Sequence, residues 1–333
     1  MTEELSAELS DTPPIEVMFR PFADADYPAL ADFLTRLHPG EPKDAEAIRR
    51  FDAGRGEHHA RVLAWEGNLL VGVAETERSR QFTQPGWYGL HVYTADPELR
   101  AVLEQSGMET LRPLNPGILH TSVSEDWPEF GWLTARGWRE HERMWLSWLD
   151  LSTFEPAAFA GRRARSQAAR IEVRTLTELG WNGLDETGLE AMQRRLYGLT
   201  IELLSDVPTT DPITPWPFEV WRERVLNHPG FTPDSPLIAV QGGNWVGLTE
   251  LYLPRPEAPG TLHQGLTGVR RAWRGRGAAW ALKLAAAERA KIQGWQSVRT
   301  GNHTVNREML GINAGMGFVR GPARVVLVRE WET

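Results

Sequence analysis

A repeated segment divides this chain into two similar halves and constrains its fold more than any other feature. Residues 131–138 (GWLTARGW) align with residues 311–318 (GINAGMGF) at a shift of 180 positions, since 311 − 131 = 180. In both copies a short helical pattern ends at a Gly-aromatic pair, before an apolar run that predicts a last strand. The repeat indicates two copies of one domain, and a chain of 333 residues is long enough for both.

Apolar periodicity predicts a similar order of strands and helices in the two halves. For the first half we expect strands at residues 15–20, 60–65, 69–74, 87–93, 118–123 and 142–151, with helices at 27–37, 44–51, 99–105 and 129–136. For the second half we expect strands at 171–176, 237–240, 245–252, 262–269, 298–301 and 323–329, with helices at 188–204, 218–226, 280–292 and 307–313.

Between the halves, residues 153–170 break this rhythm with an Ala- and Arg-rich run. The run Gly161-Arg162-Arg163-Ala164-Arg165 is typical of a solvated linker, and a nucleic-acid site is the alternative. We therefore predict a disordered tail at 1–14, a first domain at 15–152, a linker at 153–170 and a second domain at 171–333.

Composition excludes several classes of protein. The chain has no cysteine, which rules out disulfides, thiolate zinc sites and a cysteine nucleophile, and we expect no metal site. A formal net charge of -8 argues against a nucleic-acid or membrane-surface binder and is compatible with a cationic small substrate. No signal peptide is evident, and no apolar run reaches the roughly 18–20 residues of a membrane helix. We expect a soluble cytoplasmic protein.

A Gly-rich turn at residues 269–279 (VRRAWRGRGAA) joins a predicted strand to a predicted helix. At such a junction, free backbone N–H groups and the positive end of the helix dipole attract an anion. Gly275 and Gly277 allow close approach to the backbone, while Arg274 and Arg276 add positive charge. The pattern predicts a phosphate site, and a surface turn with solvated arginines is the alternative.

This turn resembles the acetyl-CoA pyrophosphate loop of the GCN5-related N-acetyltransferases. The family pattern, Arg/Gln-x-x-Gly-x-Gly/Ala, reads here Arg274, Gly277 and Ala279, with Val269 five residues before the arginine. The two Gly-aromatic pairs are similar to the family's Gly-Phe. The resemblance implies an α/β (α+β) fold of two tandem domains of this type, each a mixed, mostly antiparallel sheet flanked by helices. Double acetyltransferases such as mycothiol synthase have this architecture.

The first half lacks the glycines of this loop. Its Asp96-Pro97-Glu98-Leu99-Arg100 is similar to the family's approach to the loop arginine, but Ala101-Val102-Leu103-Glu104 follows. Glu104 places a negative charge where phosphate would lie. The resemblance therefore implies a degenerate first domain and a second domain that binds acetyl-CoA and is catalytic.

The resemblance also implies which residues contact the cofactor. Backbone groups of residues 266–269 would pair with the pantetheine amides as an added strand does, and Arg270, Arg271 and Arg276 would face phosphates. The expected cofactor-binding residues are Leu266, Thr267, Gly268, Val269, Arg270, Arg274, Gly275, Arg276, Gly277, Ala278, Ala279, Asn302 and Asn306. For the two asparagines, turn and helix-cap roles are the alternative.

Direct acyl transfer to an amine needs a general base. His263 occupies the position, six residues before Val269, where many relatives have Glu, and Glu250 on the neighbouring predicted strand is its rival. The family's acid is a Tyr four residues before the Gly of Gly-Phe, and Asn313 stands there. Either the thiolate leaves unprotonated, or Tyr197 or Tyr252 substitutes.

Acidic and aromatic residues of the second half are candidates for an acceptor site, since such groups suit a cationic amine. They are Glu202, Asp206, Asp211, Trp216 and Trp221, with helix surface and core as the alternative. We expect an acetyl-CoA-dependent N-acetyltransferase that acts on a small-molecule amine. The alternatives are a CoA-binding sensor without turnover and an enzyme for protein amines. Paired domains favour a monomer.

Overall fold

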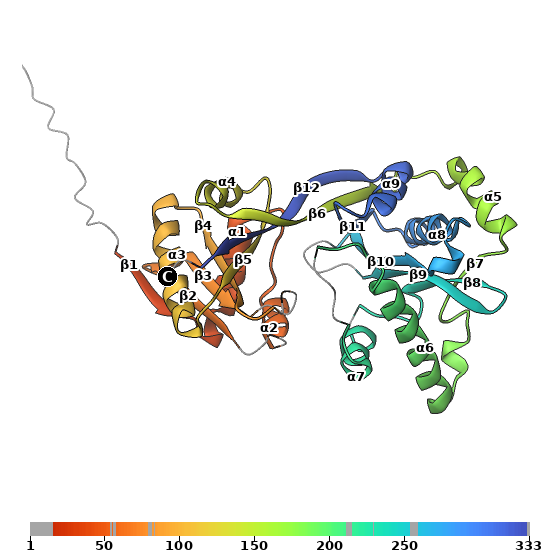
Figure 1. Cartoon of the computed structure of the whole chain (residues 1–333), viewed down its shortest axis with the longest axis horizontal. Helices are drawn as coiled ribbons and strands as arrows, with labels where there is room; N and C mark the ends of the chain where they lie inside the picture. The colour runs from red at the N-terminus through yellow and green to blue at the C-terminus, as the bar shows by residue number, and fades with distance from the viewer. Residues whose placement is uncertain are drawn as a thin grey trace, which may run out of the picture. The chain divides into compact units, whose positions relative to one another are not determined.

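The computed structural model describes residues 16–53, 55, 58–78, 82, 84–210, 215–228, 230–253 and 259–331 (Figure 1). By packing, the chain divides into two units. The first unit comprises Met1–Thr121 with Val328–Thr333, and the second comprises Ser122–Leu327. None of the helices in these ranges is long and apolar enough to cross a membrane.

The first unit is built on strands in the order β1-β2-β3-β4-β5. The strands are β1 (Val17–Pro21), β2 (His59–Glu66), β3 (Leu69–Glu77), β4 (Trp87–Thr94) and β5 (Ile118–Ser124). Its helices are α1 (Tyr27–Leu37), α2 (Ala45–Ala53) and α3 (Pro97–Leu111). Neighbouring strands from β1 to β4 are antiparallel, and β4 and β5 are parallel.

Both faces of this sheet are covered, because side chains alternate along each strand. Val73 of β3 packs toward α1, and its neighbour Ala74 packs toward α3. The α1 cluster contains Leu30, Phe33, Leu63, Leu70 and Val73. The α3 cluster contains Ala64, Ala74, Leu99 and Leu103.

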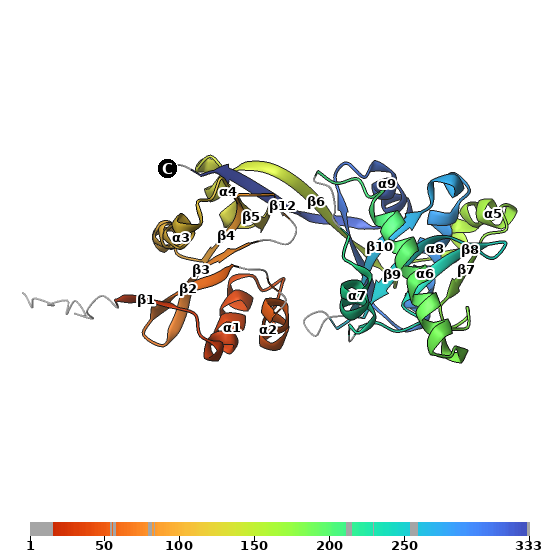
Figure 2. The ribbon, with the colours of Figure 1, turned by 60° about the horizontal axis from the view of Figure 1, so that its bottom comes forward.

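The second unit has the strand order β12-β6-β11-β10-β9-β8-β7 (Figure 2). Its strands are β6 (Arg139–Asp150), β7 (Glu172–Thr175), β8 (Pro236–Gln241), β9 (Asn244–Tyr252), β10 (Thr261–Val269), β11 (Ser297–His303) and β12 (Val319–Glu330). Its helices are α4 (Pro128–Ala135), α5 (Ala160–Ala168), α6 (Glu186–Leu204), α7 (Phe218–Trp221), α8 (Ala278–Ile292) and α9 (Arg307–Met316). The β10–β11 pair is parallel, whereas β9 pairs antiparallel with both β8 and β10.

Helices α8 and α6 pack on opposite faces of the β8–β10 part of this sheet. The α8 face buries Leu237, Ala239, Val246, Leu282 and Ala286. The α6 face buries Leu199, Leu203, Ile238, Trp245 and Leu248. The mixed sheets with helices on both faces confirm the fold class expected from the sequence.

The last strand of each half has its partners in the other half. β6 pairs with β11 from Asp150–Ser297 to Met144–His303. Near the ends of β12, Glu125 N donates to Ala323 O, and Trp331 N donates to Gly117 O, at 2.9 Å in both cases. The sequence places β6 in a first domain at 15–152 and the boundary at 153–170. The packing instead divides the chain between Thr121 and Ser122, because β6 joins the sheet of the second half.

The segment at 153–170, expected to be a linker, is folded as part of the second unit. A short 3₁₀ helix, Pro156–Phe159, leads into α5, which packs on α8. Arg163 forms an ion pair with Glu288, and the Arg162 guanidinium lies 4.5 Å from the centroid of the Trp280 ring. The basic run therefore has partners within its own chain.

Candidate functional site

The Gly-rich turn connects β10 to α8, as the sequence predicts. Gly275 and Gly277 have φ values of +76° and +87°, a left-handed region in which glycine is favoured. Gly277 is also tightly packed, since a Cβ there would lie 3.0 Å from Ser166 N of α5, whereas Gly275 has nothing within 4 Å of its Cβ position. In the first unit, β4 ends at Thr94 and α3 begins at Pro97. That connection has no comparable loop.

The arginines of this loop are held by two acidic residues of α6 and its C-terminal end. Asp206 accepts from Arg271 Nε at 2.8 Å and from the guanidinium of Arg274 at 2.6 Å. The hydrogen bond and charge of Arg271, with those of Arg274, lower the pKa of Asp206. Glu202 lies 3.1 Å from Nε of Arg270. The structure therefore places Glu202 and Asp206 at the loop rather than in a separate acceptor wall.

Two of the other three residues expected in that wall are described, and both contact Tyr197 of α6. Trp221 is buried in the α6 core cluster. Trp216 is 44% exposed, with the Arg224 guanidinium 5.1 Å from its ring centroid, and its carbonyl accepts from the Tyr197 hydroxyl at 2.7 Å. Asp211 lies outside the described residues. Of the described candidates, Trp216 and Trp221 thus lie beside Tyr197, and Glu202 and Asp206 lie at the loop arginines.

A β-bulge interrupts β10 just before the loop. Gln264 pairs with Leu251 and Thr267 with Thr249, so Gly265 and Leu266 together oppose Glu250. Gly265 is required here, since a Cβ would lie 2.7 Å from the Tyr252 ring. The structure describes β10 and β11 over their full length. Their parallel pairing runs only from Thr261–Ser297 to Gln264–Thr300. The two strands therefore part at the bulge.

Glu250 is the half-buried acid at this bulge. Its Oε2 accepts from the Tyr252 hydroxyl at 3.0 Å and from Leu266 N at 3.2 Å. Burial raises the pKa of Glu250, and these two hydrogen bonds only partly oppose that effect. Neither of the two donors is a cation. A carboxylate with a raised pKa suits proton transfer near neutral pH.

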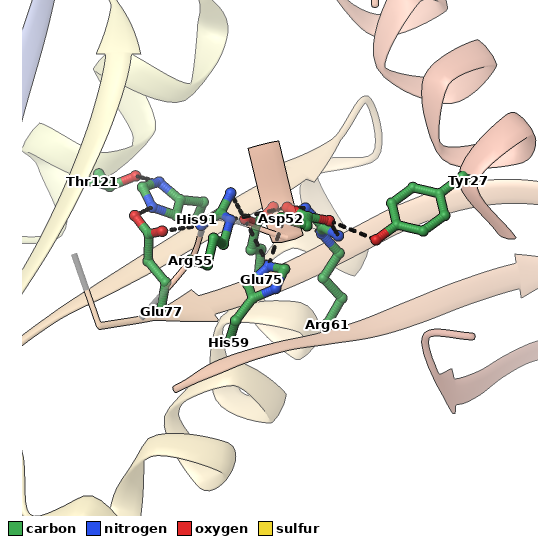
Figure 3. A network of polar contacts seen from close by, with 9 residues as sticks. All are labelled: Tyr27, Asp52, Arg55, His59, Arg61, Glu75, Glu77, His91 and Thr121. Atoms are coloured by element: carbon green, nitrogen blue, oxygen red, sulfur yellow. Dashed lines mark hydrogen bonds and ion pairs between the residues drawn. The ribbon is translucent and has the colours of Figure 1, made fainter. Parts of the chain in front are cut away.

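The corresponding carboxylate of the first unit has the opposite environment (Figure 3). Glu75 stands three residues after Gly72 on β3, as Glu250 stands three residues after Gly247 on β9. On the neighbouring strand, Arg61 is the partner of Glu75, whereas Pro236 is the partner of Glu250. The same position of the fold is thus paired with a cation in one unit and with a proline in the other.

A closed network of ion pairs surrounds Glu75. Its carboxylate lies 3.1 Å from Arg61 Nε, 2.5 Å from the guanidinium of Arg55 and 3.2 Å from His59 Nε2. Burial alone would raise the pKa of Glu75, but His59, Arg61 and Arg55 outweigh it and hold that pKa well below its usual range. Figure 3 shows the network continuing through Asp52, Glu77, His91, Thr121 and Tyr27. Its acidic and basic groups thus pair with one another within the first unit.

His263, the other candidate base, lies beside Glu250's hydrogen-bond partner. It is opposite Tyr252 in the β9–β10 register, and the two rings stack with centroids 6.2 Å apart. The His228 ring meets the other side of this group, 6.3 Å from Tyr252. Burial raises the pKa of Tyr252, and the Glu250 charge raises it further. The structure thus brings both candidate bases and Tyr252 together.

The two asparagines expected at the cofactor have different surroundings. Asn306 caps α9, accepting from Met309 N at 3.2 Å, which fits the helix-cap alternative. Asn302 accepts from Asn313 Nδ2 at 2.6 Å, and Asn313 in turn accepts from Lys283 Nζ at 2.5 Å. Sequence reasoning missed Lys283. The available signal was a lysine inside the apolar helical run Leu-Lys-Leu-Ala-Ala-Ala.

Comparison with solved structures places this arrangement in a known fold. A GCN5-related N-acetyltransferase from Sphaerobacter thermophilus matches with a TM-score of 0.63 and 19% identity, over 94% of this chain and 95% of that one. A tandem GNAT protein from the clavulanic acid biosynthesis pathway matches with a TM-score of 0.63 and 18% identity, over 95% of this chain and 98% of that one. A GNAT-family acetyltransferase from Colwellia psychrerythraea matches with a TM-score of 0.56 and 12% identity, over 95% of this chain and 100% of that one.

No protein-family model and no curated protein sequence matches this chain. The solved structures are 12–19% identical to it, a level at which the likeness establishes the fold. That likeness spans both halves, and the second half contains the Gly-rich loop, the bulged strand and the half-buried Glu250. The chain therefore has the tandem two-domain fold of the GCN5-related N-acetyltransferases.

Proposed function

We propose that this chain is an acetyl-CoA-dependent N-acetyltransferase whose second unit, Ser122–Leu327, binds the cofactor and a small-molecule amine. The observation that carries the proposal is a succession of two features along β10. A bulge beside half-buried Glu250 comes first, and a Gly-rich, Arg-rich loop follows it. Neither feature is present among the described residues of the first unit. Its β3–β4 register is regular from Gly72–Thr94 to Glu77–Gly89.

The residues of the second unit fit the parts of the cofactor. The helix N-terminus at Gly277 and the arginines suit a diphosphate, and Gly275 leaves the loop backbone open to close approach. Residues 266–269 lie past the last β10–β11 pair, where their backbone groups are placed to pair with an extended amide chain. When bound, acetyl-CoA supplies an acyl group activated as a thioester.

Glu250 acts as the general base in this proposal. Its carboxylate takes a proton from the attacking amine, directly or through one water, and releases it to solvent. Tyr252 and Leu266 N hold the carboxylate in place. The nitrogen–carbonyl bond forms, the carbon–sulfur bond breaks, and sulfur keeps the electron pair. With Tyr252 engaged by Glu250, the thiolate leaves as the anion.

A pair of matched glycine substitutions tests cofactor binding. Gly275→Glu is expected to weaken CoA binding at least about 100-fold, or about 2.7 kcal/mol, because it sets a negative charge on the phosphate loop. Gly243→Glu is the control: Gly243 also has a left-handed φ, +80°, and nothing within 4 Å of its Cβ position, but lies in the β8–β9 turn. Isothermal titration with CoA gives both affinities. A folded native protein that does not bind CoA would overturn the proposal.

An amine screen with thiol release as its readout then tests turnover. Acetyl transfer to a small amine supports the proposed function. Tight CoA binding with no transfer to small amines or to peptides would instead favour a CoA-binding sensor. Transfer to peptide amines alone would correct the acceptor class.

The carboxylate of Asp206 is expected to compete with the cofactor for the loop arginines. Asp206→Asn should tighten CoA binding by about 3- to 10-fold, or about 0.7–1.4 kcal/mol, because Arg271 and Arg274 no longer share their charge with it. Titration at low and high salt measures the change, which salt should reduce. Glu190→Gln, which removes an exposed partner of Arg194 on the same helix, is the control. Weaker binding by Asp206→Asn would show that Asp206 positions the arginines instead.

A further inference from the structure

A fully buried lysine lies on the helix that follows the Gly-rich loop. Lys283 of α8 is 1% exposed, and its Nζ lies 2.5 Å from Asn313 Oδ1 and 4.7 Å from the ring centroid of Phe318. Burying an ammonium group is costly unless it has a specific partner. The proposed mechanism has no role for this residue, so its retention in the core calls for an explanation.

Lys283 fixes which end of the Asn313 amide faces which neighbour. A lysine ammonium only donates hydrogen bonds, so the amide oxygen must face it. The amide nitrogen then points the other way, and it donates to Asn302 Oδ1 at 2.6 Å. That nitrogen carries two N–H groups, and Asn302 accepts only one of them.

This pair of asparagines lies next to the place where β10 and β11 part. The last parallel pair is Gln264–Thr300, and the Thr300 hydroxyl donates to Gln264 O at 3.1 Å. Asn302 follows two residues later on β11. On the other side of β10, Glu250 contacts Leu266 N in the bulge. Asn302 and Glu250 thus come from the two strands that neighbour this point of β10, and α9 supplies Asn313.

We propose that Lys283 is a positioning residue for acyl transfer: by holding the oxygen of Asn313, it directs the second N–H of that amide to the sulfur of the acyl thioester. This inference rests on the proposed function. As the carbon–sulfur bond breaks, sulfur gains negative charge, and a preorganised N–H donor stabilises it. Asn313 gives up no proton, and the thiolate is protonated by water after it leaves.

The charge state of Lys283 is compatible with this role. Burial lowers the pKa of Lys283 to about 7, and it is the sole cause of the shift. Charged groups of α8 and the elements packed on it have other partners: Glu288 pairs with Arg163 of α5, Arg289 with Asp234, and Lys291 with Glu155. The ammonium form excludes the opposite orientation of the Asn313 amide, whereas the neutral amine can donate or accept, so Lys283 fixes this orientation most firmly below its pKa.

The test measures the thiol pKa of bound CoA, which reports on the sulfur environment without turnover. Titration calorimetry first establishes CoA binding, and the ultraviolet absorbance of the thiolate is then followed against pH. In the native protein the bound thiol should ionise about one pH unit below a free thiol, whose pKa is about 8.5. Lys283→Met, which keeps the volume, should lose most of this shift. The control is Lys291→Met on the same helix, where Nζ donates to Phe154 O.

Asn313→Asp makes the test directional. The new carboxylate would pair with Lys283 and turn a negative charge toward the sulfur, so the bound thiol pKa should rise above that of free CoA. A merely structural role for Lys283 predicts no such reversal. Equal thiol pKa values in the native protein, Lys283→Met and Asn313→Asp would overturn the inference while leaving CoA binding intact. Absence of CoA binding by the native protein would remove both the inference and the proposed function.

Discussion

Replacing Glu250 by Gln is expected to lower kcat by about 10²- to 10⁴-fold, the range for losing a general base, with little change in the affinity for acetyl-CoA. Gln keeps the volume of Glu, and its amide oxygen can accept the hydrogen bonds of Tyr252 and Leu266 N. It cannot take a proton from the amine. The variant should therefore fold and bind the cofactor normally but transfer the acetyl group slowly.

The pH profile of kcat separates the base from a structural role. Glu250 works when deprotonated, and its pKa is raised by burial. The native kcat should therefore fall as pH decreases through this raised pKa, and this acidic fall should be absent from the profile of Glu250→Gln. Any acidic fall that remains in the variant reports the protonation of the amine substrate.

Two further variants decide between the candidate bases. Glu190→Gln, at an exposed residue of α6 that pairs with Arg194, is the control and should keep the native profile. Near-native kcat in Glu250→Gln, together with a large loss in His263→Asn, would transfer the role of base to His263.

Local spacing explains why the loop could be predicted from the sequence. The sequence spacings from Val269 to Arg274, Gly277 and Ala279 all fall within the single turn between β10 and α8. Both Gly275 and Gly277 adopt the left-handed conformation that favours glycine. Short-range geometry of this kind depends little on the rest of the fold. Helix α1, expected at 27–37, likewise forms at Tyr27–Leu37, because its apolar spacing and its N-terminal turn are local signals.

Pairing between distant segments could not be predicted in this way. The apolar pattern of β6 would serve equally well in either sheet, so the sequence does not reveal that it pairs with β11. Contacts of Asp206 with Arg271 and of Lys283 with Asn313 join residues from different elements, 65 and 30 positions apart. The matched glutamates did leave a signal. Val-Gly-Val-Ala-Glu ending at Glu75 aligns with Val-Gly-Leu-Thr-Glu ending at Glu250, at a shift of 175 (250 − 75).

That alignment shows how one fold position acquires two roles. A buried carboxylate flanked by a cation is held ionised, and a buried carboxylate without one has its pKa raised. Arg61 provides the cation beside Glu75, and Pro236 provides none beside Glu250. In the proposed mechanism, the glutamate of the second unit is therefore available for proton transfer, while that of the first unit stabilises its fold through ion pairs.

Replacing Arg61 by Met is expected to lower the free energy of unfolding of the first unit by about 3 kcal/mol. Breaking a buried ion pair costs about 3–5 kcal/mol, because it leaves a buried charge uncompensated. The lower end of this range applies here, because the two carboxylates that lose Arg61, Asp52 and Glu75, both keep their contact with Arg55. The acetyltransferase rate of the folded protein should stay within about twofold, as the network belongs to the first unit.

Denaturant titration, with hydrogen exchange of β2 and β3 amides to report on the first unit, measures the effect of Arg61→Met. Because the pKa of folded Glu75 is lowered, its stabilisation is complete above the pKa of an unfolded Glu, about 4.3, and is lost as pH falls through the folded-state pKa. Arg61→Met should weaken this pH dependence. The double variant Arg61→Met, Glu75→Leu should recover part of the lost stability, because apolar side chains then replace the pair. If Arg61→Met left stability unchanged but abolished activity, the first-unit network would be part of the functional site.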